Sequence, residues 1–455
     1  MKRAIEVIKM NISRSSLLGA IMLLCSSTIF AQQEPAKPSA LITFNQAVAK
    51  AAANQPLVLQ AEAAVRASED RIGQTQGEYL PRVTAAAGYD YVSPKQFIGV
   101  GSESVKIAPE NAYDFHLDAG MLVYDFGKRE LKLKLARNAE DSALIGVESI
   151  RQSIAYETAR IYYDLLFLKD EVQELDEQIG RLNEHLEIAK KRESDGASIH
   201  LDVLSTQIRI SKTANKRIDA ATTFANQKIA LRQLMGLALD VDYDVTGNFA
   251  TVQEQRDEQT LIATALANRP EMQAALKAEN AEELGRSLAN LGNYPSVSVL
   301  AEAGYRNGLL TATNQNADAM TFNWGVGLRL SMPVFDGLRN DKAKDEAESQ
   351  AEAAHQGSEE LRRNITAQVL QALQDLSASQ AQAINTRSQV EQAQEDTNMT
   401  KLQYDLGAGT NADYLDSLET LSSTKIDDFN AQLKEAQSGL ALQEAIGDKM
   451  PLGGL

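Results

Sequence analysis

The chain has 455 residues, a formal net charge of -17 at pH 7, and aromatic residues at only 5 % of its composition. The acidic balance argues against nucleic acid as a partner, because a phosphate backbone requires a basic surface. Few aromatic residues together with many alanine, glutamine, glutamate and leucine residues are typical of long helices.

Residues 1–31 predict a secretory signal peptide, because a basic segment precedes the apolar run LLGAIMLLCSSTIFA and cleavage is expected after Ala31. The alternative is an N-terminal membrane anchor. About 14 apolar residues are few for that role, since a spanning helix needs roughly 20. Cys25 is the only cysteine and leaves with the signal, so the mature chain is expected to enter an oxidising compartment without a disulfide.

The rest of the chain repeats itself. Pro81 and Pro295 begin similar segments 214 residues apart, and Gly196 and Gly407 do so 211 residues apart. Four motifs recur in the same order, which indicates two copies of one structural unit. We therefore predict a first repeat made of a helix, two strands and a long helical hairpin, then a connecting segment, a second repeat and a tail: 32–240, 241–260, 261–447 and 448–455.

Two strands are predicted in each repeat, because apolar and polar residues alternate with period two after each proline. Each of the four strands has roughly ten to twelve residues and one apolar face, as outer-membrane barrel strands do. Half-buried strands in a soluble sandwich are the alternative. The apolar faces begin at Val83, Tyr113, Val297 and Phe322.

Four strands are too few for a closed barrel. A sheet in lipid must close, because an open edge leaves backbone groups unpaired in hydrocarbon, and about eight strands make the smallest common barrel. The sequence therefore predicts that several chains pool their strands.

Long helices are predicted after the strands, from Gly127 to about Glu193 and from Leu338 to Tyr404. Apolar residues in the first of them alternate spacings of four and three, which is the coiled-coil repeat. Some 67 residues at about 1.5 Å each give a helix of roughly 100 Å. A second helix returns in each repeat, and a solvated cytoplasmic coiled coil is the alternative that the signal peptide argues against.

The segments RESDGASIHLDVLSTQ, QYDLGAGTNADYLDSLET, VYDFGKR and PVFDGLR resemble the hairpin tips and barrel-to-helix junctions of the TolC-like outer-membrane efflux proteins. The resemblance implies a mixed α and transmembrane β fold, in which a homotrimer forms a twelve-stranded barrel, four strands per chain, continuous with a periplasmic barrel of coiled-coil hairpins. It also implies an outer-membrane location and a passive exit duct for efflux or type I secretion. The implied partners are an inner-membrane pump, a periplasmic adaptor (membrane fusion) protein and outer-membrane lipid.

The same resemblance assigns roles to individual residues. Asp413 and Asp416 match an aspartate ring that narrows the pore entrance, and Asp202 and Tyr404 match polar links between hairpins. The chain has Gly409 where the family member with the best-described closed gate has an arginine, so that closing salt bridge is not expected here. Capping of helices is the alternative role of the three aspartates. The remaining positions are tip turns and adaptor contacts at Gly196, Gly407, Leu204 and Leu415, and barrel junctions at Pro81, Gly127, Pro295 and Gly337.

Nothing in the sequence indicates catalysis or a cofactor. The four histidines lack ligand spacing, so no metal is expected, and no nucleophile elbow, phosphate loop or paired-acid motif is present. A structural or adhesive coiled coil that spans the periplasm without a lumen is the alternative function. The histidines are His116, His185, His200 and His355.

Overall fold

From Ala40 onward the chain forms one compact unit. The predicted signal peptide, part of the connecting segment and the last residues of the tail lie outside the part that is described. The computed structural model describes residues 40–100, 103–106, 108–238, 241–249, 254–308 and 316–450.

The four predicted strands are confirmed and form one antiparallel sheet in the order β2-β5-β7-β8. Their register places Leu117 opposite Ala303 and Ala303 opposite Trp324, so the apolar faces of the strands lie on the same side. Within the described chain, β2 and β8 each pair with another strand on one side only. The bounds are β2 Arg82–Tyr91, β5 Asn111–Tyr124, β7 Ser296–Arg306 and β8 Thr321–Ser331.

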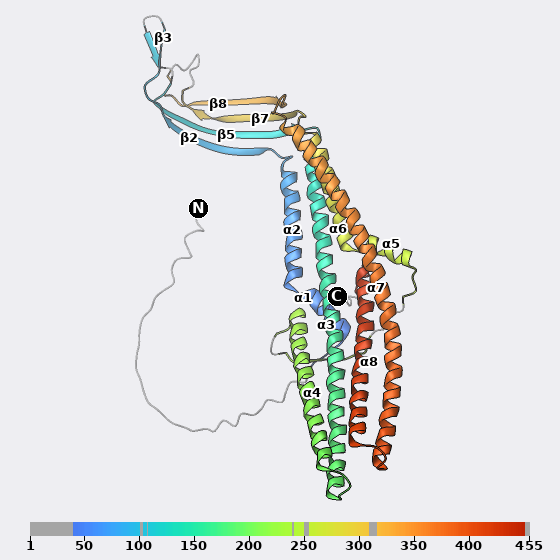
Figure 1. Cartoon of the computed structure of the whole chain (residues 1–455). Helices are drawn as coiled ribbons and strands as arrows, with labels where there is room; N and C mark the ends of the chain where they lie inside the picture. The colour runs from blue at the N-terminus through green and yellow to red at the C-terminus, as the bar shows by residue number, and fades with distance from the viewer. Residues whose placement is uncertain are drawn as a thin grey trace, which may run out of the picture. The chain divides into compact units, whose positions relative to one another are not determined.

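The loop between β2 and β5 contains a small hairpin that the sequence did not predict, with β3 at Phe97–Val100 and β4 at Glu103–Lys106. The Nζ atom of Lys106 lies 2.7 Å from a carboxylate oxygen of Asp318, in the loop between β7 and β8. This ion pair joins the two loops at the end of the sheet that lies away from the helices (Figure 1).

The two long helices are confirmed. α3 spans Lys128–Ser194 and α7 spans Arg339–Asp405, with 67 residues each. The returning helices α4, His200–Leu234, and α8, Asn411–Ala445, have only 35 residues each. Each hairpin therefore has unequal arms. In the part of the chain that the structure describes, no helix combines the length and apolarity needed to cross a membrane.

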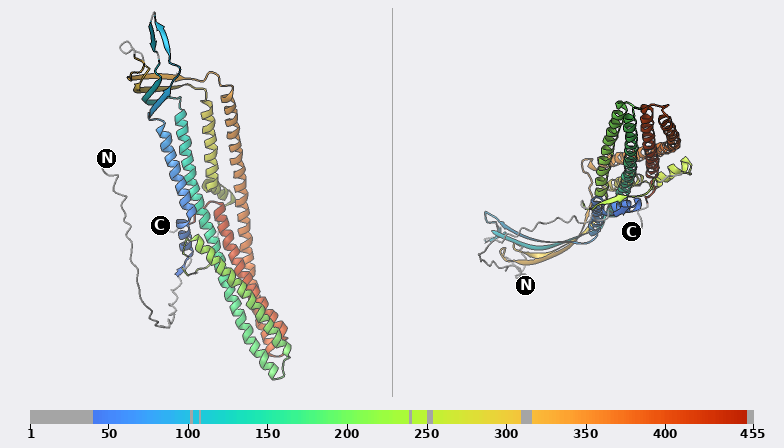
Figure 2. Two further views of the ribbon diagram at one scale, coloured as in Figure 1. Left: turned by 90° about the vertical axis from the view of Figure 1, so that its left-hand side faces the viewer. Right: turned by 90° about the horizontal axis from the view of Figure 1, so that it is seen from below.

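Shorter helices cover the part of each long helix that the returning helix does not reach. Near the sheet the packing order is α2-α3-α6-α7, and near the hairpin turns it is α4-α3-α8-α7 (Figures 1 and 2). Strand β2 and helices α2 and α4 thus follow one edge of the unit, and β8 and α7 follow the other. α2 spans Pro56–Gly77 and α6 spans Pro270–Asn290.

A compact core lies where these two layers meet. Strands β1, Ala40–Ile42, and β6, Tyr243–Val245, pair in parallel beside α3. The Tyr162 hydroxyl on α3 is buried and lies 2.8 Å from the Ile42 carbonyl oxygen and 2.6 Å from that of Thr246. These bonds tie the segments beside β1 and β6 to α3. Helix α1, Phe44–Asn54, packs against α3 in this core, whereas α5, Glu258–Asn268, packs against α7 in a separate cluster of buried residues.

Candidate functional site

Both hairpins reverse at a glycine. Gly196 and Gly407 have φ angles of +71° and +74°, a region that favours glycine because it has no Cβ. The next residue in each turn donates its N–H across the helix end, Ala197 to the Arg192 carbonyl and Ala408 to that of Gln403, both at 2.8 Å. The two tips therefore use the same helix-terminating geometry, as the repeat predicts.

Of the three tip aspartates, Asp413 takes part in capping a helix. Asp413 lies in the first turn of α8 and accepts hydrogen bonds from the Thr410 hydroxyl at 2.6 Å and the Thr410 N–H at 3.1 Å. These bonds lower the pKa of Asp413. Asp202 lies in the first turn of α4 and is bonded to the hydroxyl of Ser198. The Asp413 contact is a capping box and fits the alternative role, in which an aspartate stabilises a helix start, whereas α4 has no side-chain capping bond.

Asp416 has a different environment. Its side chain is 69 % exposed, and its carboxylate lies 2.5 Å from a guanidinium nitrogen of Arg209 on α4. Arg209 also forms an ion pair with Glu419, one turn further along α8. Arg209 was not predicted from the sequence, and it joins the first hairpin to the second beside the tip.

Gly409 lies inside the second turn. A Cβ on Gly409 would lie 3.1 Å from the Cβ of Gln403 and 3.2 Å from the backbone nitrogen of Tyr404. This turn is therefore packed tightly against the end of α7, and the cation nearest to Asp416 comes from Arg209 instead.

Tyr404 is buried, and its hydroxyl has no hydrogen-bond partner among the described residues. Among the described residues, this hydroxyl therefore makes no polar link between the hairpins. Instead, the guanidinium of Arg192 on α3 lies 4.2 Å from the centre of the Tyr404 ring and donates a bond of 2.9 Å to the Tyr404 carbonyl. Of the two tip leucines, Leu204 is exposed, whereas Leu415 is 2 % exposed and packs in the same cluster as Tyr404.

The predicted barrel junctions lie where strands and helices meet. Pro81 and Pro295 come directly before β2 and β7, and Gly127 and Gly337 have φ angles of +90° and +71° just before the long helices. In the first junction the Asp125 carboxylate accepts bonds from the N–H groups of Gly127 and Arg129, at 3.2 and 2.8 Å. The aspartate of VYDFGKR therefore fixes the start of α3.

The sheet has two chemically different faces. One face is apolar and largely exposed, and β8 alone contributes Phe322, Trp324, Val326, Leu328 and Leu330 to it. The opposite face carries charges and has a hollow of about 770 Å³ lined in part by Arg82, Asp118, Glu302 and Arg329. A sheet of this kind places one face in lipid and the other in a water-filled lumen.

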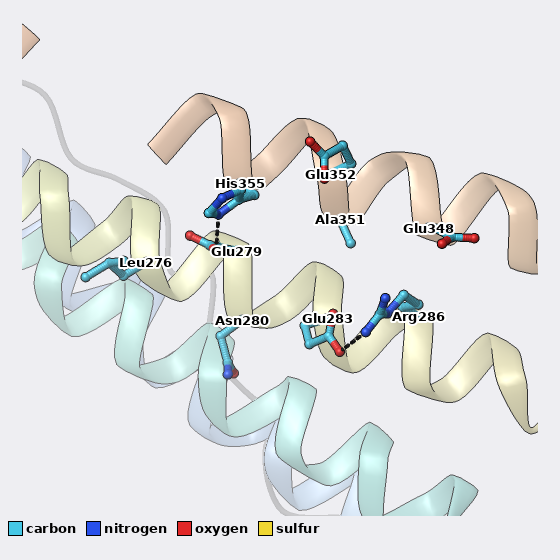
Figure 3. A pocket seen from close by; sticks show the side chains of 9 residues that line it. All are labelled: Leu276, Glu279, Asn280, Glu283, Arg286, Glu348, Ala351, Glu352 and His355. Atoms are coloured by element: carbon cyan, nitrogen blue, oxygen red, sulfur yellow. Dashed lines mark hydrogen bonds and ion pairs between the residues drawn. The ribbon is translucent and has the colours of Figure 1, made fainter. Parts of the chain in front are cut away.

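A further cleft of about 550 Å³ lies between α6 and α7 (Figure 3). Glu279 on α6 accepts a bond of 2.8 Å from the Ser358 hydroxyl on α7 and lies 2.9 Å from His355. Glu283 pairs with Arg286 along α6 at 2.6 Å. The contacts of Glu279 hold the two helices together. No group of three or more metal-ligating side chains is found in the described parts of the chain.

Comparison with known proteins agrees with this geometry. The outer membrane efflux protein family matches residues 47–237 and 261–448. The outer membrane protein TolC of Vibrio cholerae is 22 % identical over 402 residues, which cover 87 % of this chain and 88 % of the relative. The pyoverdine export outer membrane protein OpmQ of Pseudomonas putida is also 22 % identical, over 85 % of this chain and 82 % of its own.

Among solved structures, that of the outer-membrane channel OprN superimposes with a TM-score of 0.76 at 20 % identity, over 89 % of each chain. The fold is thus that of an outer-membrane channel protomer, in which a four-stranded part of a barrel continues into long helical hairpins. The chain belongs to the outer membrane efflux protein family. Its function is that of an outer-membrane exit duct for efflux or secretion, and its location is the outer membrane with an extension into the periplasm. This family consists of channel proteins rather than enzymes.

Proposed function

We propose that three copies of this chain close into one duct, with residues 32–240 and 261–447 as its two repeats. The strand order β2-β5-β7-β8 is the observation that carries the proposal, because each edge strand has a row of backbone groups that needs a strand from another copy. β2, α2 and α4 follow one edge and β8 and α7 the other, so a single head-to-tail contact serves both the sheet and the helices.

The duct is passive and depends on an inner-membrane pump and a periplasmic adaptor. Leu204 and the two tip turns are the surface offered to the adaptor, since Leu415 is buried. The tips form the entrance, which opens when the hairpins of each chain separate. In the closed entrance, Arg209 neutralises Asp416. It supplies the positive charge that an arginine at position 409 would supply and that Gly409 does not.

Conductance across a planar lipid bilayer tests the duct directly. Purified mature protein is expected to form trimers in detergent and to give discrete conductance steps once inserted. A lumen-free structural coiled coil would give none. A mature chain that stays monomeric and dissolved without detergent would contradict the proposal, because the apolar face of the sheet requires lipid.

Arg209→Ala is expected to raise the basal conductance. The substitution removes two ion pairs between the hairpins of each chain, and about 1 kcal/mol per chain shifts the ratio of separated to joined hairpins within that chain by about fivefold. Lys216→Ala is the matched control. Lys216 lies on the same helix, and its Nζ atom lies 3.4 Å from a carboxylate oxygen of Glu419. Among the described residues, the ion pair with Asp416 is made by Arg209 and not by Lys216. Equal conductance of the two variants would remove Arg209 from the closing role.

A further inference from the structure

His185 lies on α3, about three turns before the tip, at the contact between the two hairpins. Its side chain is 2 % exposed. The rings of Tyr404 on α7 and Tyr414 on α8 approach it edge-on, with centroid distances of 5.0 and 4.8 Å. A single imidazole from the first hairpin is therefore enclosed by both helices of the second.

The Nε2 atom of His185 lies 2.6 Å from Oδ1 of Asn411, the first residue of α8. The Asn411 amide nitrogen donates in turn to the Ser205 hydroxyl at 3.0 Å and to the Asp202 carbonyl at 3.3 Å, both on α4. Because the amide nitrogen has these two acceptors, its oxygen faces the histidine and Nε2 carries the proton. Asn411 is thus held by both helices of the first hairpin.

The other ring nitrogen has no such partner. Nδ1 of His185 is buried and makes no hydrogen bond to any described residue. A proton on Nδ1 would create a buried donor without an acceptor and a buried positive charge, and both are costly. The enclosed ring is therefore suited to the neutral form only.

The charges around His185 do not reverse its preference for the neutral form. Burial lowers the pKa of His185, and Arg192 acts in the same direction from α3, while the bond to Asn411 and the carboxylates Asp405 and Asp202 oppose it. Tyr404 and Tyr414 remain neutral, because burial raises the pKa of each phenol. Desolvation by burial has the largest effect on the pKa of His185, and it favours the neutral ring.

We propose that His185 is a protonation-sensitive latch between the two hairpins, which holds the entrance closed while neutral and releases it when protonated. The proposal rests on the proposed function, in which the hairpins of each chain separate to open the duct. A separated His185 faces water and has a pKa near the ordinary value of about 6.5. Neutral His185 therefore stabilises the closed entrance fully at pH values above about 6.5. This stabilisation is lost as the pH falls through the lower pKa that His185 has in the closed state.

The test is the conductance of purified trimers in planar bilayers between about pH 8 and about pH 5. Wild-type conductance is expected to rise at least about threefold on acidification. In His185→Gln the amide still donates to Asn411 but cannot titrate, so the rise should disappear. In His185→Phe the ring is kept but the bond is lost, so conductance should be high at both pH values.

His200→Gln is the matched control, because His200 is exposed beside the same tip and, among the described residues, forms an ion pair with Glu193 alone, at 2.8 Å. It should keep the wild-type pH response. A pH response that survives in His185→Gln would overturn the latch and leave the duct intact. A complete lack of conductance in the wild type and in Arg209→Ala would instead contradict the proposed function, and the latch with it.

Discussion

Gly304→Ala is expected to prevent assembly of the barrel sheet. Gly304 lies on β7 opposite His116 of β5, and these are the two inner strands of the sheet. A Cβ at this position would lie 2.4 Å from the carbonyl oxygen of Phe115 and 2.6 Å from the Cα of His116. Because backbone atoms make the clash, no change of rotamer relieves it, and the strands must move apart.

The neighbour cannot move aside either. The His116 ring is held along its own strand, with Nδ1 at 3.0 Å from Asp114 and Nε2 at 3.0 Å from Asp118. We expect a loss of at least about 3 kcal/mol per chain, at or above the upper end of the usual overpacking cost. The measurement is the amount of SDS-resistant trimer in outer-membrane fractions.

Gly325→Ala is the matched control for this experiment. Gly325 lies on β8 opposite Glu302, and a Cβ there would have no atom within 4 Å. Its trimer yield should equal that of the wild type. Normal yields from both variants would show that β5 and β7 separate more easily than their register indicates.

The strands and long helices could be predicted because their signals are local. Alternation with period two gave the apolar face of each strand, and the glycines at 127 and 196 gave the ends of α3 to within about two residues. The unequal lengths of the hairpin arms were not predicted. The same heptad pattern runs along all of α3, although α3 packs against α4 over one part of its length and against α2 over the other.

The contacts between the hairpins could not be predicted in the same way. His185 and Asn411 are 226 residues apart, and Arg209 and Asp416 are 207 apart, so no local pattern pairs them. The sequence feature that could have indicated these contacts is a residue that differs between the two repeats. At the offset of 211, Arg209 falls on Thr420, so a charge present in one copy has no counterpart in the other. Such positions are candidates for contacts that join the two copies.

The ion pair of Glu174 makes a second connection between the hairpins, further from the tip. Glu174 on α3 is 3 % exposed, and its carboxylate lies 2.5 Å from Arg181 and 2.9 Å from Lys425 on α8. Glu174→Gln is expected to lower the free energy of unfolding by about 2 kcal/mol per chain, because both cations lose a buried partner. The loss is smaller than for a fully buried pair, since Arg181 and Lys425 keep some contact with water.

Thermal loss of helical circular dichroism in detergent measures this effect, and Glu177→Gln is its matched control. Glu177 faces the same two cations at 3.6 and 3.9 Å, but its side chain is 49 % exposed. Its removal should cost less than about 0.5 kcal/mol. Equal melting temperatures for the two variants would mean that Glu174 adds nothing to the contact between α3 and α8. A lower melting temperature for Glu174→Gln alone would show that the buried carboxylate stabilises the contact between α3 and α8 away from the tip.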